Sequence, residues 1–246
     1  PGPRENDIGV SEVVNFDPTA WEARWLSAGI GQWQRSCRQI NANVSNEDVR
    51  ITCVFDYEYK RELCAQTQWT YTVNNSGAVK VDVEVLLNEN LPPLPRVGIS
   101  LTIANSKHDN TQVKWLGLGP FENYPDRQSA ARFGEFNLNV DELHTPYIFP
   151  TDNGLRSGCK KLEIGELQVQ GRFLFAASSY SQSQLAAAKH SNELVAADII
   201  HVHIDHQHMG VGGDDSWSPS THKEYLLEQQ RYNYSLIFNT INKCGS

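Results

Sequence analysis

The sequence predicts an all-β protein, built as a large antiparallel double-sheet sandwich with one or two short helices. Residues 79–85 alternate valines with polar side chains at a period of two, which is typical of a strand with one buried face. Residues 74–77, Asn-Asn-Ser-Gly, are turn formers, and residues 67–73 before them are rich in Thr, Tyr and Trp. These two runs therefore predict a hairpin. Many short strands with few helices favour an antiparallel sandwich.

Further strands are predicted where β-branched and aromatic residues gather, at 49–55, 97–103, 171–176, 199–204 and 232–238. Three prolines between residues 92 and 95 interrupt this pattern, because proline lacks the amide hydrogen that a sheet needs. No composition change divides the chain. We therefore expect a single domain over residues 1–246.

A first helix is predicted after Asp17, whose carboxylate can cap a helix that has Pro18 at its first position. Trp21, Trp25 and Leu26 then recur at helical spacing and predict one buried face.

A second helix is predicted from Ser181, because Ser181 and Gln184 have the spacing of a capping box. Long loops remain at 120–127, 146–158 and 208–220, and loops of this length commonly carry function or an interface.

Composition narrows the class of partner. The 246 residues are 39% hydrophobic and 20% charged, with a formal net charge of −8, so nucleic acids and anionic membranes are poor partners. No run approaches the roughly 18 apolar residues of a membrane span. The five cysteines are odd in number, scattered and without a Cys-x-x-Cys motif. They predict free thiols in a reducing compartment, and hence a cytoplasmic protein.

The most unusual segment is residues 210–219, Gly-Val-Gly-Gly-Asp-Asp-Ser-Trp-Ser-Pro. Its glycines allow backbone angles that other residues avoid, and Trp217 follows them. One interpretation is a rigid loop that presents the flat face of Trp217 to a sugar ring. The other is a core residue beneath a turn, which the usual burial of tryptophan favours. We expect Asp214 and Asp215 to be turn or capping groups.

Histidines at 201, 203, 206 and 208 form the other tempting cluster. A His-x-His pair without a third ligand at a defined spacing is a weak metal signal, so no metal site is predicted. We interpret these side chains as exposed or hydrogen-bonded imidazoles on an edge strand. The loop carboxylates Glu122, Asp126 and Asp152 are interpreted as solvated or salt-bridged groups.

Three long segments together resemble a known family. Residues 115–127, 145–156 and 208–219 closely resemble, in order and spacing, motifs of the C-terminal, small-chain domain of β-galactosidases in glycoside hydrolase family 2. The opening 6–12, Asn-Asp-Ile-Gly-Val-Ser-Glu, is similar to the first segment of that domain. Two departures are Pro1 to Glu5, in place of the usual Arg-Ala-Pro-x-Asp, and His144, in place of an aromatic residue.

The resemblance implies a β-supersandwich similar to the galactose mutarotase fold. It implies that Trp217 reaches an active site as an aromatic platform for the galactoside. It also implies a mobile loop within residues 1–18 that moves over the pocket, with Gly9, Ser11 and Glu12 as further substrate-binding residues.

For the whole enzyme, the resemblance implies retaining hydrolysis of terminal, non-reducing β-D-galactosides such as lactose. The catalytic glutamates would lie on a separate TIM barrel, so no catalytic residue is expected in this chain, and the isolated chain should be inactive. The expected partners are the remaining domains, a galactoside and further copies in a homo-oligomer. No cofactor is expected here, since Mg²⁺ and Na⁺ would be bound mainly by other domains.

Two alternatives remain open. The first is a free-standing carbohydrate-binding or structural assembly module. The second is a mutarotase-like aldose isomerase, which requires a histidine and a carboxylate converging over one sugar site. The sequence shows no such pairing.

Overall fold

The computed structural model describes residues 20–45, 48–104, 111–214 and 221–241. Within these ranges eleven strands belong to one antiparallel sheet. The strands are β1 Gln34–Val44, β2 Asp48–Tyr59, β3 Glu62–Asn74, β4 Val79–Leu87, β5 Arg96–Ala104, β6 Gln112–Gly119, β7 Arg132–Asn139, β8 Arg156–Ile164, β9 Leu167–Ser178, β10 Ile199–His208 and β11 Arg231–Thr240. The predicted all-β, antiparallel fold is confirmed.

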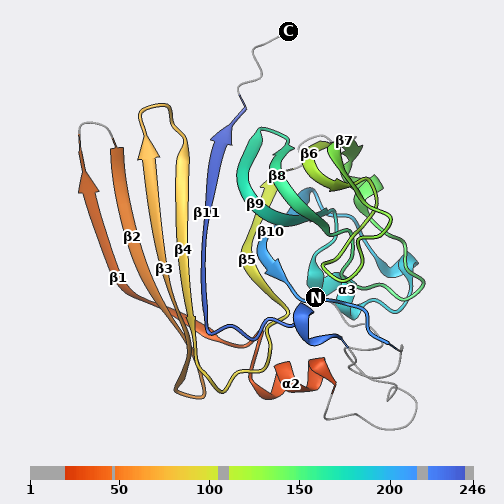
Figure 1. Ribbon diagram of the computed structural model, residues 1–246, viewed down its shortest axis with the longest axis horizontal. Coiled ribbons are helices and arrows are strands. Elements are labelled where there is room, and N and C mark those ends of the chain that lie inside the picture. The colour runs from red at the N-terminus through yellow and green to blue at the C-terminus, as the bar shows by residue number, and fades with distance from the viewer. Residues whose placement is uncertain (1–19, 46–47, 105–110, 215–220, 242–246) are drawn as a thin grey trace.

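The order of the strands is β1-β2-β3-β4-β11-β9-β8-β6-β7, and β10 joins β9 to β5. Figure 1 shows β1 to β4 and β11 aligned as a broad wall, with β6 and β7 on the opposite side of the molecule. The short helices described are α2 Trp21–Ser27 and α3 Gln182–Ala187, with 3₁₀ turns η2 Val140–Leu143, η3 Ser191–Glu193 and η4 Lys223–Tyr225.

The predicted hairpin is β3 and β4, in which Val73 pairs with Val79. The side chain of Asn74 accepts backbone N–H bonds from Ser76 and Ala78, each at 3.0 Å, and Gly77 adopts a positive φ of 82°. A glycine suits this left-handed position because it has no Cβ to clash with the backbone. The alternate valines of β4 are buried as the period of two predicts.

Strand β9 joins the two halves of the sheet. Its first part pairs with β11, from Leu167 to Gly171, and its last part pairs with β10, from Leu174 to Ser178. Gly171 lies at the change of partner with a φ of 150°, and a Cβ there would lie 2.9 Å from Leu236 Cδ2. The backbone can take this φ so close to β11 because this residue has no side chain.

The sheet encloses one large apolar core, and a second, smaller apolar cluster is separate from it. Alternate residues of β4, β11, β9, β8, β6 and β10 belong to the same buried cluster, as do Trp21 and Trp25 of α2. Trp115 lies at its centre, with ring centroids 5.2 Å from Phe136 and 5.6 Å from Phe175. Residues far apart in the sequence therefore form one packed interior, which fixes where the loops between the strands emerge.

The predicted helices are present with one correction. Ser181 Oγ accepts from the Gln184 backbone N–H at 3.2 Å and Gln184 Oε1 accepts from the Ser181 N–H at 2.9 Å, which confirms the capping box. In α2 the burial of Trp21 and Trp25 is confirmed, but the prediction for Leu26 is wrong, since this residue is 48% exposed. Leu26 follows Trp25 directly and so lies roughly 100° around the helix from it, away from the buried face. The proposed cap Asp17 lies outside the described residues.

The edge-strand prediction for the histidines is wrong. Strand β10 pairs with β5 on one side and β9 on the other, so it is an interior strand. A true edge is β1, which is exposed along its whole length and carries an irregularity between Cys37 and Gln39. An irregular edge of this kind discourages pairing with other chains. Among the described residues, no helix has the length and hydropathy to cross a bilayer.

Candidate functional site

The three loops that carry the recognisable motifs meet in space. Asn123 donates its backbone N–H to the Leu155 carbonyl at 2.8 Å, which joins the loop after β6 to the loop before β8. The Gly154 N–H donates to Glu122 Oε2 at 2.6 Å and strengthens the same junction. The motif segments 115–127 and 145–156 therefore belong to one structural unit, which the segment 208–219 also joins.

Asp126 connects this unit to the third loop. Its Oδ2 accepts the Gly212 N–H at 2.6 Å, across 86 positions of sequence. A Cβ added to Gly210 would lie 2.7 Å from the same oxygen and 2.8 Å from Tyr225 Cβ. Because a real Cβ never comes this close, the glycine allows the backbone to lie directly against the carboxylate. Asp126 thus anchors the start of the 210–219 segment.

The described part of the 210–219 segment is also bonded to Thr221 and His222. Thr221 Oγ1 donates to the Gly212 carbonyl at 3.0 Å, and His222 Nε2 lies 2.8 Å from Asp214 Oδ1. The hydrogen bond from Asp214 and its charge raise the pKa of His222. The loop is therefore closed at its base by two side-chain bridges. Asp214, predicted as a turn or capping group, instead pairs with the His222 side chain, and Asp215 lies outside the described residues.

Beneath the loops lies a buried group of charged side chains. Arg96 of β5 places its guanidinium 3.1 Å from the Asp205 carboxylate of β10 and 3.4 Å from that of Asp152. His208 Nε2 lies 4.0 Å from Asp152. Both carboxylates are buried, so the prediction of a salt-bridged Asp152 is confirmed while that of a solvated one is wrong. Removing one member of such a group leaves an uncompensated buried charge.

The protonation states in this buried group depend on one cation, Arg96, which faces two carboxylates, Asp152 and Asp205. Burial alone would raise the pKa of Asp152, but the Arg96 charge outweighs it and holds this pKa below its usual range. Burial raises the pKa of Asp205, and Arg96 only partly offsets that rise. Burial, followed by the charge of Arg96, lowers the pKa of His203 to about 4 and that of His208 well below the usual value. Both imidazoles are therefore neutral near pH 7.

His208 has a structural place in this arrangement. Its Nδ1 lies 2.7 Å from the Met209 carbonyl, so a neutral ring donates its proton there. Its ring packs edge-on against Tyr124 at 5.3 Å between centroids. Tyr124 in turn belongs to a small apolar cluster with Leu155, Ala176 and Val211. The three loops thus share an apolar floor.

The structure describes some of the residues considered for the site and not others. Trp217, Gly9, Ser11 and Glu12 lie outside the described residues. A histidine and a carboxylate do converge, as His208 and Asp152, although the sequence showed no such pairing.

Sequence reasoning missed Arg96 and the loop-closing pair Thr221 and His222. No local pattern marks Arg96, which begins an otherwise apolar strand. Asp205 lies inside the histidine-rich segment and could have been noticed there.

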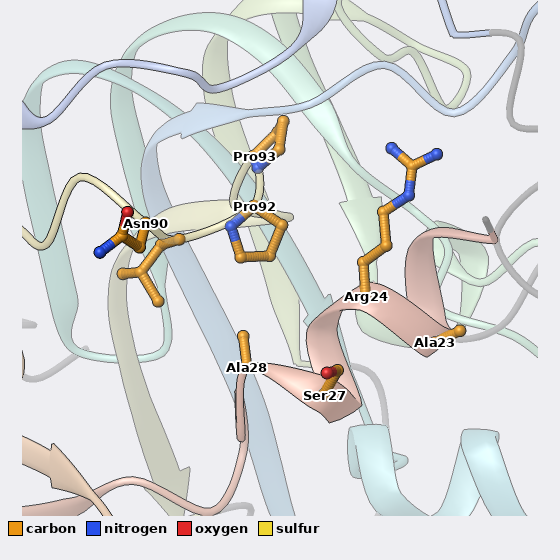
Figure 2. Close-up of a pocket in the computed structure, with 8 residues that line it drawn as sticks. Ala23, Arg24, Ser27, Ala28, Asn90, Pro92 and Pro93 are labelled. Atoms are coloured by element: carbon orange, nitrogen blue, oxygen red, sulfur yellow. The ribbon is translucent and has the colours of Figure 1, made fainter. Parts of the chain in front are cut away.

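A concave surface elsewhere is a poor alternative site. It lies between α2 and residues 90–93, and Figure 2 shows Arg24, Ser27 and Ala28 on one side and Asn90, Pro92 and Pro93 on the other. Arg24 is its one titratable lining residue among those described. Trp25 Nε1 donates to the Pro93 carbonyl at 2.8 Å, so this contact holds the helix against the sheet. It offers no acid–base pair for chemistry.

Known proteins are similar to this chain over nearly its whole length. Residues 2–238 match the family described as beta galactosidase small chain. A beta-galactosidase of Pseudoalteromonas haloplanktis is 69% identical over 95% of this chain, and one of Alteromonas mediterranea is 55% identical over 96%. Among solved structures, a GalM/aldose epimerase homologue from C. elegans matches 83% of this chain and 70% of its own at 13% identity. Its TM-score is 0.41.

Fold and loops together define an all-β, antiparallel domain whose three motif loops are joined by hydrogen bonds. The chain spans 22% of the Pseudoalteromonas relative and 23% of the Alteromonas one, so it corresponds to one part of those longer polypeptides. The chain belongs to the beta galactosidase small-chain family.

Proposed function

We propose that this chain is the C-terminal domain of a β-galactosidase and completes its active site for retaining hydrolysis of terminal, non-reducing β-D-galactosides such as lactose. In this proposal the nucleophile and the acid/base glutamate belong to a TIM barrel in the remaining polypeptide. The chain therefore contributes binding and positioning rather than a catalytic residue. A small sugar is buried more completely at a junction of two domains than on either surface alone.

The observation that carries the proposal is the anchored base of the loop that contains Trp217. Asp126 holds Gly212 at 2.6 Å, and Thr221 and His222 bridge back across the loop. The described residues on either side of Trp217 are held by these bonds, and less conformational entropy is then lost there on binding. We assign Trp217 as the platform for the C–H face of the galactoside or its aglycone.

We assign Gly9, Ser11 and Glu12 to a mobile loop within residues 1–18 that moves over the same pocket and excludes water. The assignment extends the sequence resemblance. A change in protection of these residues on galactoside binding, measured by hydrogen exchange, tests it.

The alternative isomerase is favoured by one observation, the meeting of His208 and Asp152 at 4.0 Å. Burial counts against it, because the His208 side chain is 0% exposed and its Nδ1 is engaged by a backbone carbonyl. A general acid or base must come within hydrogen-bonding reach of the substrate. We therefore interpret the Arg96 group as a scaffold beneath the loops.

Metal ions and location complete the proposal. Arg96 pairs with both buried carboxylates, Asp152 and Asp205, and so occupies the side of each that faces the other. We place the Mg²⁺ and Na⁺ sites implied by the family on other domains. A cytoplasmic location and a homo-oligomeric enzyme are also proposed, the former supported by the free thiols of Cys37, Cys53, Cys64 and Cys159.

A reconstitution experiment tests this function. The chain is mixed with a β-galactosidase polypeptide truncated before the region that it matches, and hydrolysis of an aryl β-galactoside is followed. We expect activity from the mixture and none from either component alone.

Hydrolysis by the isolated chain would overturn the assignment of the catalytic glutamates to another domain. Binding of galactose by the chain without any reconstitution would favour a free-standing binding module. Interconversion of the galactose anomers by the chain would favour the isomerase.

A further inference from the structure

Large apolar side chains are exposed on two of the site loops. Phe121 is 67% exposed, Ile148 is 94% exposed and Phe149 is 39% exposed. Phe121 directly precedes Glu122, and Ile148 and Phe149 directly follow Tyr147. Since Glu122 and Tyr147 are hydrogen-bonded to each other, the three exposed side chains lie close to one contact. We call Phe121, Ile148 and Phe149 the apolar tip.

The apolar tip stands on a fixed framework. The Glu122 carboxylate accepts hydrogen bonds from the Tyr147 hydroxyl, from the Arg127 guanidinium and from the Gly154 N–H. Arg127 also donates to the Tyr147 hydroxyl at 3.1 Å. Beyond the tip, residues 150–157 are buried. The side chains are therefore displayed by anchored backbone, and a partner would lose little entropy in ordering them.

The same framework reaches the loop that contains Trp217. Asp126, five positions after Phe121, holds Gly212 through a 2.6 Å hydrogen bond. A partner that covers the apolar tip would thus lie beside the base of the Trp217 loop. Arg127 is half-exposed at the rim and would supply a polar border. An apolar centre with aromatic residues and a charged rim is the usual composition of an interface.

We propose that the apolar tip is the docking surface for the remainder of the β-galactosidase polypeptide. The occupant follows from length, because the chain spans 22–23% of its Pseudoalteromonas and Alteromonas relatives, and more than three quarters of each polypeptide lies outside it. Isolated exposed apolar residues are common on any surface, but these three flank one hydrogen-bonded junction between two anchored loops, which favours a contact. This inference rests on the proposed function and names the surface through which it operates.

The test measures docking separately from catalysis. Ile148→Asp and Phe121→Asp are each titrated into the truncated β-galactosidase polypeptide, with aryl-galactoside hydrolysis and sedimentation as parallel readouts. The matched control is Ile40→Asp on β1, a 62% exposed isoleucine at the opposite end of the strand order from β6 and β7.

We expect each tip variant to weaken the apparent Kd by roughly thirtyfold or more, as for truncation of a central interface residue. Activity at saturating chain should match that of the unsubstituted chain, because the proposed function assigns no sugar contact to the tip. The control should change the Kd by less than about threefold, as expected outside an interface. If a tip variant has a lowered unfolding midpoint, Ile148→Ser replaces it.

Several outcomes would overturn the docking surface. Tip variants that titrate like the unsubstituted chain refute it while leaving the proposed function intact, and a strong effect of Ile40→Asp places the interface on β1 instead. If the unsubstituted chain shows no binding by sedimentation, both proposals fail. If the chain sediments alone as a dimer that Ile148→Asp dissociates, the occupant is a second copy rather than the catalytic polypeptide.

Discussion

The Asp126 carboxylate anchors the start of the loop that contains Trp217. It receives the Gly212 N–H at 2.6 Å, and the glycines at 210 and 212 leave room for that approach. The carboxylate itself has no place in the proposed chemistry. Its role is positional, since it determines how the chain leaves β10 toward Trp217.

We predict that Asp126→Ala destabilises the chain by about 1.5–3 kcal/mol, the range for a hydrogen bond to a charged group. Asp126→Asn should cost less because the amide oxygen can still accept. Hydrogen exchange at the Gly212 amide and urea unfolding measure the effect, with the exposed Glu89→Ala as control. Unchanged protection of Gly212 in Asp126→Ala would contradict the anchoring role.

His203 gives the charged group beneath the loops a pH dependence. The groups that influence it are Arg96, Asp152 and His201, and its folded pKa of about 4 lies below the value near 6.5 expected for the unfolded chain. Between these values the unfolded chain binds the proton more readily. This residue therefore contributes stability that is present above about pH 6.5 and is lost as the pH falls toward 4.

Replacing His203 by Gln should remove part of the acid destabilisation, on the order of 2–3 kcal/mol between pH 6.5 and 4. Urea unfolding of the variant and the unsubstituted chain across this range gives the difference directly. His190→Gln is the control, because His190 is exposed and its ring bonds to the neighbouring Glu193. Identical slopes for the His203 variant and the unsubstituted chain would refute the assignment.

At the scale of elements, β9 decides the shape of the sheet. It pairs with β11 at one end and β10 at the other, and the change falls at Gly171. The change of partner at Gly171 lets both halves of the sheet pack on the same core. The loops after β6 and β10 therefore emerge near each other. The candidate site therefore depends on a bend far from it in the sequence.

Gly171→Ala should destabilise the chain by about 1–3 kcal/mol, since its Cβ would lie 2.9 Å from Leu236 Cδ2 and 3.0 Å from the Ser235 carbonyl oxygen. Gly134→Ala on β7 is the matched control, because the nearest atom to its Cβ would be an ordinary 3.5 Å away. Urea unfolding midpoints compare the two. Equal midpoints would show that β9 tolerates a side chain at its bend.

At the scale of the whole molecule, the proposed function divides one active site between two parts of a polypeptide. The chain spans 22% of its Pseudoalteromonas relative, and the described parts of its three motif loops are bonded to one another. Such a division separates docking from chemistry. Substitutions in the apolar tip and at Trp217 should consequently affect different steps.

In the reconstituted enzyme we expect Trp217→Ala to lower kcat/KM for an aryl galactoside about 10- to 100-fold, as for loss of a buried aromatic contact. Docking of the chain should be unchanged, and Trp217→Phe should recover part of the activity because it keeps a flat ring. Steady-state kinetics at saturating chain separate these effects. Full activity in Trp217→Ala would remove the platform from the proposal.

The sequence by itself determined the local structure of this chain. The alternation of Val79 to Val85, the turn at Asn74 and the capping box of Ser181 each depend on neighbours within a few positions, so pattern was sufficient to predict them. The family could likewise be identified from motifs alone, because order and spacing are properties of the sequence.

Only the tertiary structure decided which of those residues meet. Arg96, Asp152 and Asp205 come from two strands and a loop, and no periodicity links them. The interior position of β10 was misjudged for the same reason, since strand neighbours are chosen by the bend at Gly171 and the packing of the core. Long-range contacts are set by how the whole sheet closes, which no local window of the sequence contains.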